Sequence, residues 1–137
     1  MAFLPYKYRD GAIDPWELMP AGAGLNLHVG TALKIASGKL AIAKAAETVE
    51  YICMMDTEAA TADGQMIPVI AVNDDTIYET TMSAQISAIA VGDTYQLDSA
   101  GEQITATKAG AAKVVSWDGT EAGSTVQVAL VPVAAGG

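Results

Sequence analysis

The strongest constraint on the fold is the stretch from Val91 to Ile104, VGDTYQLDSAGEQI. Tyr95 and Leu97 alternate with polar neighbours, which is the two-residue period of a strand that is buried on one face. Residues 98–101, Asp-Ser-Ala-Gly, then offer a side-chain acceptor at the start of a turn and a glycine where the backbone must adopt positive φ. Because the alternation resumes after this turn, the stretch predicts a β-hairpin.

The same pattern recurs along the chain and predicts an all-β fold. Eight or nine short strands with turns every 8–12 residues indicate a small barrel or sandwich, or a β-tulip-like form, built from successive hairpins. Pro68 predicts that its strand is at an edge or bulged, because proline cannot donate to a ladder. Strand order does not follow from hairpins. The further hairpins are expected at Leu33–Ile42, at Tyr51–Met55 with Met66–Val72, and at Val114–Trp117 with Val126–Val131.

The chain of 137 residues fits one domain with an unusual N-terminal segment. Residues 1–24 contain three prolines, which disfavour a long helix and predict an extended arm. Residues 25–133 are expected to form the β-domain and residues 134–137 a frayed tail. Half of the aromatic residues lie in the arm: Phe3, Tyr6, Tyr8 and Trp16.

These four rings would be a liability in water, so the arm is expected to lie against something. One interpretation is that it wraps over its own domain. The other is that the rings anchor it on a neighbouring subunit or a partner, since aromatic side chains bury a large area at low entropic cost.

The net charge of −9 argues against two classes of partner. Phosphates of nucleic acids and anionic membrane surfaces repel such a chain, so neither is expected to bind it. The N-terminus lacks the continuous apolar segment of a secretory signal, and no apolar run approaches the length of a membrane span. Synthesis in the cytoplasm is the simplest expectation.

Catalytic chemistry is not expected. His28, the single histidine, lies between apolar residues, where a structural role is the commoner one. Cys53 lies in an apolar strand, where a thiol is buried and unreactive. Two acidic clusters lack the order of ligands in a calcium-binding loop, so solvated loops are expected and neither a metal nor another cofactor is assigned. These clusters are Asp56, Glu58 and Asp63, and Asp74, Asp75 and Glu79.

Residues 25–131 resemble the head decoration, or capsid cement, proteins of tailed bacteriophages. The likeness rests on the 30–40 hairpin, the Ile52 strand followed by Ile67-Pro68-Val69, the run DTIYET at 75–80, Val91-Gly92-Asp93, and the aliphatic strand at 126–131.

The resemblance implies a viral structural protein without enzymatic activity. It would be made in the host cytoplasm, bind the outer surface of the assembled head and bridge subunits of the major capsid protein. It also implies a homo-oligomer, namely a trimer, with arms reaching onto the capsid. The alternative is a fibre-base or surface-adhesion β-module that recognises a host receptor or glycan.

Overall fold

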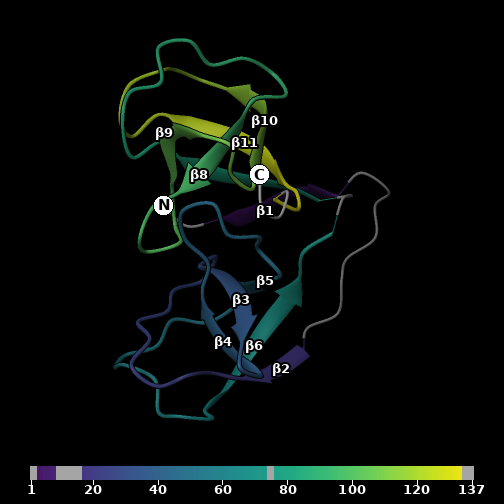
Figure 1. Cartoon of the computed structure of the whole chain (residues 1–137), viewed down its shortest axis with the longest axis vertical. Helices are drawn as coiled ribbons and strands as arrows, with labels where there is room; N and C mark the ends of the chain where they lie inside the picture. The colour runs from purple at the N-terminus through teal and green to yellow at the C-terminus, as the bar shows by residue number, and fades with distance from the viewer. Residues whose placement is uncertain (1–2, 9–16, 74–75, 134–137) are drawn as a thin grey trace.

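The structure is a computed structural model that describes residues 3–8, 17–73 and 76–133, with the backbone alone for 4–8. These residues form eleven strands in two sheets, and the fold is all-β (Figure 1). The described ranges contain no helix that could cross a membrane. The first six strands are β1 (Leu4–Tyr8), β2 (Glu17–Pro20), β3 (Ala32–Ala36), β4 (Lys39–Ile42), β5 (Tyr51–Cys53) and β6 (Met66–Ala71). The others are β7 (Thr76–Thr81), β8 (Thr94–Leu97), β9 (Ile104–Lys108), β10 (Ala112–Trp117) and β11 (Thr125–Leu130).

The two sheets occupy the two halves of the molecule. The six-stranded sheet has the order β1-β7-β11-β10-β8-β9 and forms the upper half of Figure 1, and the five-stranded sheet, β2-β6-β5-β3-β4, forms the lower half. Both sheets curl. Just beyond β7, Met82 bridges Ile104 at the start of β9, and just beyond β2, Ala21 bridges Leu40 on β4.

The predicted hairpins are confirmed. β3 pairs with β4 around a turn in which Ser37 and Gly38 have φ of 51° and 78°. Antiparallel pairs also join β5 to β6, β8 to β9 and β10 to β11. Each pair is adjacent in sequence, so local turn chemistry was enough to predict it.

The segment predicted as an arm contributes one edge strand to each sheet. β1 pairs with β7 and β2 pairs with β6. Pro5 and Pro20 are compatible with these strands because an edge strand has one unpaired side, where a missing donor costs no ladder bond. Among the described residues, the predicted boundary at residue 24 therefore does not coincide with the start of the sheets.

The prediction that Pro68 marks an edge or a bulge is wrong. β6 lies between β2 and β5, and its register with both neighbours is continuous. The amide of Met54 donates to the Pro68 carbonyl (2.9 Å), so the Pro68 nitrogen also faces the β5 side, where β5 has already ended at Cys53. An interior strand tolerates proline here because Pro68 lies just beyond the end of β5, where only the return bond to Met54 is missing.

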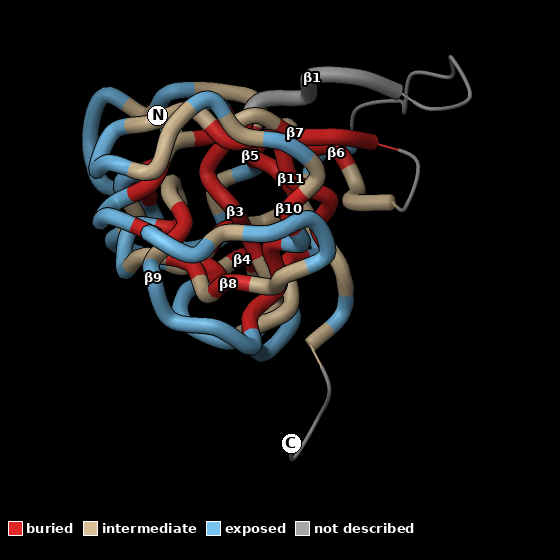
Figure 2. The backbone as a smooth tube through the Cα atoms, turned by 90° about the horizontal axis from the view of Figure 1, so that it is seen from above, coloured by how far each residue is buried: buried red, intermediate tan, exposed pale blue. Residues whose placement is uncertain are grey.

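Two apolar cores are separated by the five-stranded sheet. Ala32 and Ile52, paired across β3 and β5, face the first core with the inner side chains of the six-stranded sheet. Leu33 and Cys53, the next residues along these strands, face the second core. Figure 2 shows that buried residues follow the strands while the exposed residues lie mostly in connecting loops.

The turn between β8 and β9 joins the two halves. Gly101 has φ of 68°, and its carbonyl accepts a hydrogen bond from the Ala32 amide (2.8 Å). Nearby, Ala45 and Leu97 exchange two backbone hydrogen bonds of 3.0 Å each. The β8–β9 hairpin thus also connects one sheet to the other.

Candidate functional site

Of the four predicted anchor residues, only Phe3 has a side chain that the structure describes. The Phe3 side chain is fully buried in the first core of its own chain, so it is not free to contact another molecule. Tyr6 and Tyr8 belong to β1, where the structure describes the backbone alone, and Trp16 lies outside the described residues. The role of these three rings stays a prediction.

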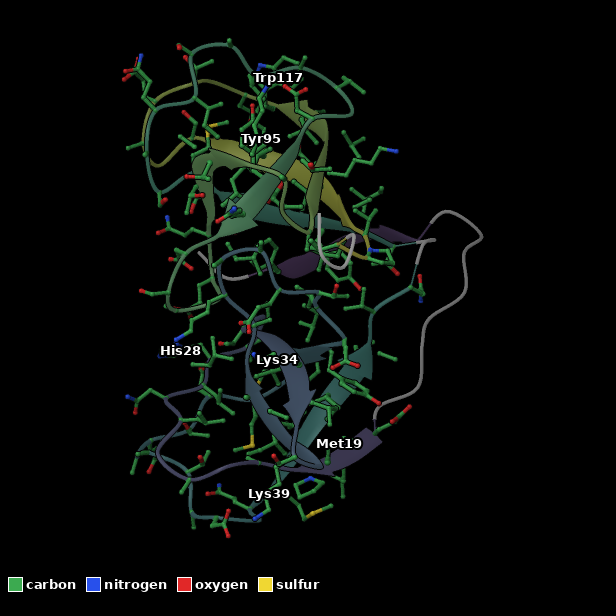
Figure 3. All side chains as sticks on the ribbon, viewed as in Figure 1. Met19, His28, Lys34, Lys39, Tyr95 and Trp117 are labelled. Atoms are coloured by element: carbon green, nitrogen blue, oxygen red, sulfur yellow. The ribbon has the colours of Figure 1, made fainter. Side chains whose placement is uncertain are left out.

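His28 lies at the boundary between the two halves (Figure 3). Its Nδ1 is 2.8 Å from Oε1 of Glu102, and the amide of Glu102 donates to the Asp98 carboxylate (2.8 Å). His28 is therefore held by a carboxylate from the β8–β9 turn. The His28 side chain is 56% exposed, so the contact between His28 and Glu102 contributes little to stability.

Cys53 is buried on β5 and its Sγ donates to the Met55 carbonyl (3.1 Å). Burial is the largest cause that raises the pKa of the thiol, and the neighbouring Asp56 charge acts in the same direction. A raised pKa leaves less thiolate, which is the nucleophilic form. This is the environment of a core side chain.

Two residues of the first predicted acidic cluster make structural contacts. Asp56 accepts a hydrogen bond from the Val29 amide (2.9 Å), and Asp63 pairs with Lys39 (2.7 Å). Within the described residues, no group of three or more His, Cys, Asp or Glu could hold a metal ion. In the second cluster, Glu79 accepts from Gln127 Nε2 (2.8 Å), while Asp74 and Asp75 lie outside the described residues.

A hollow of about 470 Å³ lies beside β8 in the six-stranded half. Its walls contain only apolar side chains, two uncharged polar ones and a glycine. This lining offers no acid, base or thiol for general acid–base or nucleophilic chemistry. The lining residues are Ala46, Thr94, Gln96, Ala109, Gly110, Val131, Pro132 and Val133.

The outward face of the β2–β6 pair exposes large apolar side chains next to one another. Leu18 is 63% exposed and Met66 is 52% exposed. Leu18 pairs with Pro68 and Pro20 pairs with Met66, so all four residues lie on one face of the sheet and are close neighbours. We call these four residues the β2–β6 apolar face.

The opposite side of the same two strands is buried. Met19, Ile67 and Val69 pack in or against the second core. Strands that are apolar on both sides are typical of sheets covered on both faces. Further along β6, Ile70 points to the same side as Met66 but is only 4% exposed. This side of β6 is therefore covered at Ile70 and open to solvent at Met66.

The described part of the chain is acidic overall. The described ranges contain twelve carboxylates and six lysines, a difference of six negative charges. Three of the lysines are paired with carboxylates: Lys34 with Glu47, Lys39 with Asp63, and Lys108 with Asp93. Hydrogen bonds from Lys34 and from the Lys44 amide lower the pKa of Glu47 although burial, the largest single cause, acts in the opposite direction.

The β2–β6 apolar face was missed by sequence reasoning. The sequence pattern places Leu18 in the predicted arm and Met66 in a predicted strand, and it assigns neither residue a binding role. The available signal is that residues 18–20, LMP, and residues 66–71, MIPVIA, are apolar at consecutive positions, which predicts burial on both sides.

Comparison of the chain with protein-family models and with curated proteins finds no match.

Proposed function

We propose that the chain is a structural protein that binds the outer surface of an assembled viral head and bridges subunits of its major capsid protein. The observation that carries this proposal is the β2–β6 apolar face. It leaves two large side chains in water on a protein whose other large apolar residues are mostly packed in two cores. The resemblance to head decoration proteins supplies the kind of partner.

The acidity of the chain supports a position on the outside of the head. A net charge of −9 is unfavourable next to packaged nucleic acid, whose phosphates would repel it. Placement on the outer face keeps the protein away from that charge.

Bridging would stabilise the head by mass action. A protein that binds the assembled lattice and not its dissociated subunits shifts the equilibrium toward the lattice. If the chain acts as a trimer, its later contacts become intramolecular, so each single contact can be modest. Oligomerisation and the contacts of Tyr6, Tyr8 and Trp16 are part of this proposal.

Co-sedimentation with undecorated heads tests the proposal. The purified full-length chain is expected to pellet with the heads, to saturate at a fixed ratio and to raise the temperature at which they disassemble. A chain that stays in the supernatant and leaves this temperature unchanged would refute it. Binding to whole host cells instead would favour the adhesion module.

The anchoring rings are best tested by substitution in the full-length chain. Deleting residues 1–20 would remove β1, β2 and the buried Phe3 and would therefore disrupt the fold. A loss of head binding by that variant would not identify the rings as anchors. Replacing Tyr6, Tyr8 and Trp16 together by alanine is expected to weaken head binding. Unchanged occupancy by this variant would exclude the three rings as anchors.

A further inference from the structure

We propose that the Asp118–Gly119 pair is a modification site at which the aspartate converts spontaneously to isoaspartate, and that the Asp63–Gly64 pair of the same chain is protected from this reaction. Both pairs lie in the described ranges, and both aspartates are exposed to water. A further pair of this kind, Asp10–Gly11, lies outside the described residues. The reaction needs no partner, so the site does not depend on the proposed function.

The reaction takes place within the chain and uses only water. The backbone nitrogen of Gly119 attacks Cγ of Asp118 and loses its proton, and a carboxyl oxygen leaves as water, which closes a five-membered succinimide ring. Water then opens the ring by breaking the bond between this nitrogen and the original backbone carbonyl carbon of Asp118, so the main chain continues through Cγ. The water released in the first step is taken up in the second, and isoaspartate has the same composition as aspartate. Glycine favours the attack because it has no Cβ to hinder its nitrogen.

Both reacting groups of the Asp118–Gly119 pair are without partners in the described part of the chain. The Gly119 amide donates no hydrogen bond there, and the Asp118 carboxylate makes neither a hydrogen bond nor an ion pair. The pair follows Trp117, the last residue of β10, which lies in the upper part of Figure 3. No contact among the described residues has to break before the nitrogen and the carboxyl group approach each other.

Both reacting groups of the Asp63–Gly64 pair are held. The Gly64 amide donates a hydrogen bond to the carbonyl of the buried Ala21 (2.8 Å), and the Asp63 carboxylate pairs with Lys39 (2.7 Å). The hydrogen bond of the nitrogen must break before it can attack, and this requires local opening of the chain. Because both aspartates are exposed, hydrogen bonding and not access to water distinguishes the two pairs.

Isomerisation of Asp118 should loosen the loop that follows it. This loop is held by a hydrogen bond from the Ile86 amide to the Thr120 carbonyl and by one from the Gly123 amide to the Met82 carbonyl, each of 2.8 Å. Isoaspartate adds one methylene group to the main chain, two residues before Thr120. The added length shifts the Thr120 carbonyl relative to Ile86, so we expect the isomerised chain to melt at a lower temperature.

The test follows both pairs in one full-length protein, incubated for weeks at physiological temperature and mildly acidic pH, either native or in urea. An endoprotease that cleaves before aspartate but not before isoaspartate, followed by mass spectrometry, measures the isomerised fraction at each site. In the native chain Asp118 should isomerise at least about tenfold faster than Asp63, whereas in urea the two rates should agree within about threefold. The variant Asp118→Glu keeps the exposed charge, but its ring would have six members and close far more slowly. It should show no isomerisation at position 118 and an unchanged rate at Asp63.

Each part of the proposal has its own contrary result. A native chain without isoaspartate at position 118, or with equal rates at Asp118 and Asp63, overturns the site. A difference that persists in urea shows that the neighbouring residue types set the rates, and it overturns the protection of Asp63 by hydrogen bonding. If the isomerised chain, separated by ion-exchange chromatography, melts at the same temperature as the fresh protein, the effect on the loop is overturned.

Discussion

Replacing Gly101 by alanine should destabilise the protein more than replacing any glycine that has room around it. Gly101 has φ of 68°, and a Cβ built on it would lie 2.9 Å from the Ala43 carbonyl oxygen, 2.9 Å from Ile42 Cγ2 and 3.0 Å from the Ala32 carbonyl oxygen. Two of these atoms are backbone atoms of the opposite half, so they cannot move aside by changing a rotamer. Gly101 thus carries both a conformational and a steric penalty.

The two penalties can be estimated separately. A left-handed backbone conformation costs a residue with a Cβ about 1–2 kcal/mol relative to glycine. Forcing a methyl group into a packed contact costs about 1–3 kcal/mol. The expected loss in the free energy of unfolding is therefore about 2–5 kcal/mol, a large part of the 5–15 kcal/mol typical of a domain.

Gly38→Ala is the matched control for this substitution. Gly38 has φ of 78°, and no heavy atom lies within 4 Å of the position of its Cβ. The control should therefore show the conformational penalty without the steric one. Urea unfolding followed by the fluorescence of the half-buried Trp117 measures both variants. If Gly101→Ala costs no more than Gly38→Ala, the close docking of the β8–β9 turn on the five-stranded sheet is refuted.

Two further predictions follow from the ionisable groups. Cys53 is buried and the pKa of its thiol is raised. At pH 8 a disulfide reagent should therefore modify Cys53 at least about 100-fold more slowly in the native chain than in urea. Equal rates would show that β5 is open to solvent. The pKa of Glu47 is lowered in the folded state, so its contribution is present above the ordinary value of 4.5 and is lost as the pH falls through the folded value. Glu47→Gln should therefore cost about 0.2–1 kcal/mol at pH 7 and less at pH 3, measured by urea unfolding, and a cost that does not change with pH would contradict this.

Strand pairs that are adjacent in sequence can be predicted from the sequence, whereas pairs of distant strands cannot. Hairpins such as β3–β4 were predictable because a short turn containing Ser37 and Gly38 fixes which strands pair. The pairing of β7 with β1 and β11 brings together strands that are far apart in sequence, and no local signal specifies it. Aliphatic alternation gives the buried side of a strand but not the identity of its neighbour.

The N-terminal segment was difficult for a different reason. Its prolines are equally consistent with a free arm and with edge strands, because both leave backbone nitrogens unpaired. The decision depends on whether another strand offers a free edge at the right place, and β6 and β7 both do. Phe3, next to β1, is then buried in the first core, and its burial cannot be predicted from composition because it depends on how the strands pack.

The β2–β6 apolar face shows most clearly what sequence periodicity cannot predict. Ile70, Pro68 and Met66 alternate along β6 and point to the same side, yet Ile70 is 4% exposed and Met66 is 52% exposed. Ile70 pairs with Ile52 of the first core, whereas Met66 pairs with Pro20 on the edge strand β2. Sequence periodicity predicts which side a residue faces, whereas the extent of the covering layer decides whether that side meets protein or water. A strand that is apolar on both sides but covered over only part of its length therefore predicts a binding face, and it can be found only when both layers are placed.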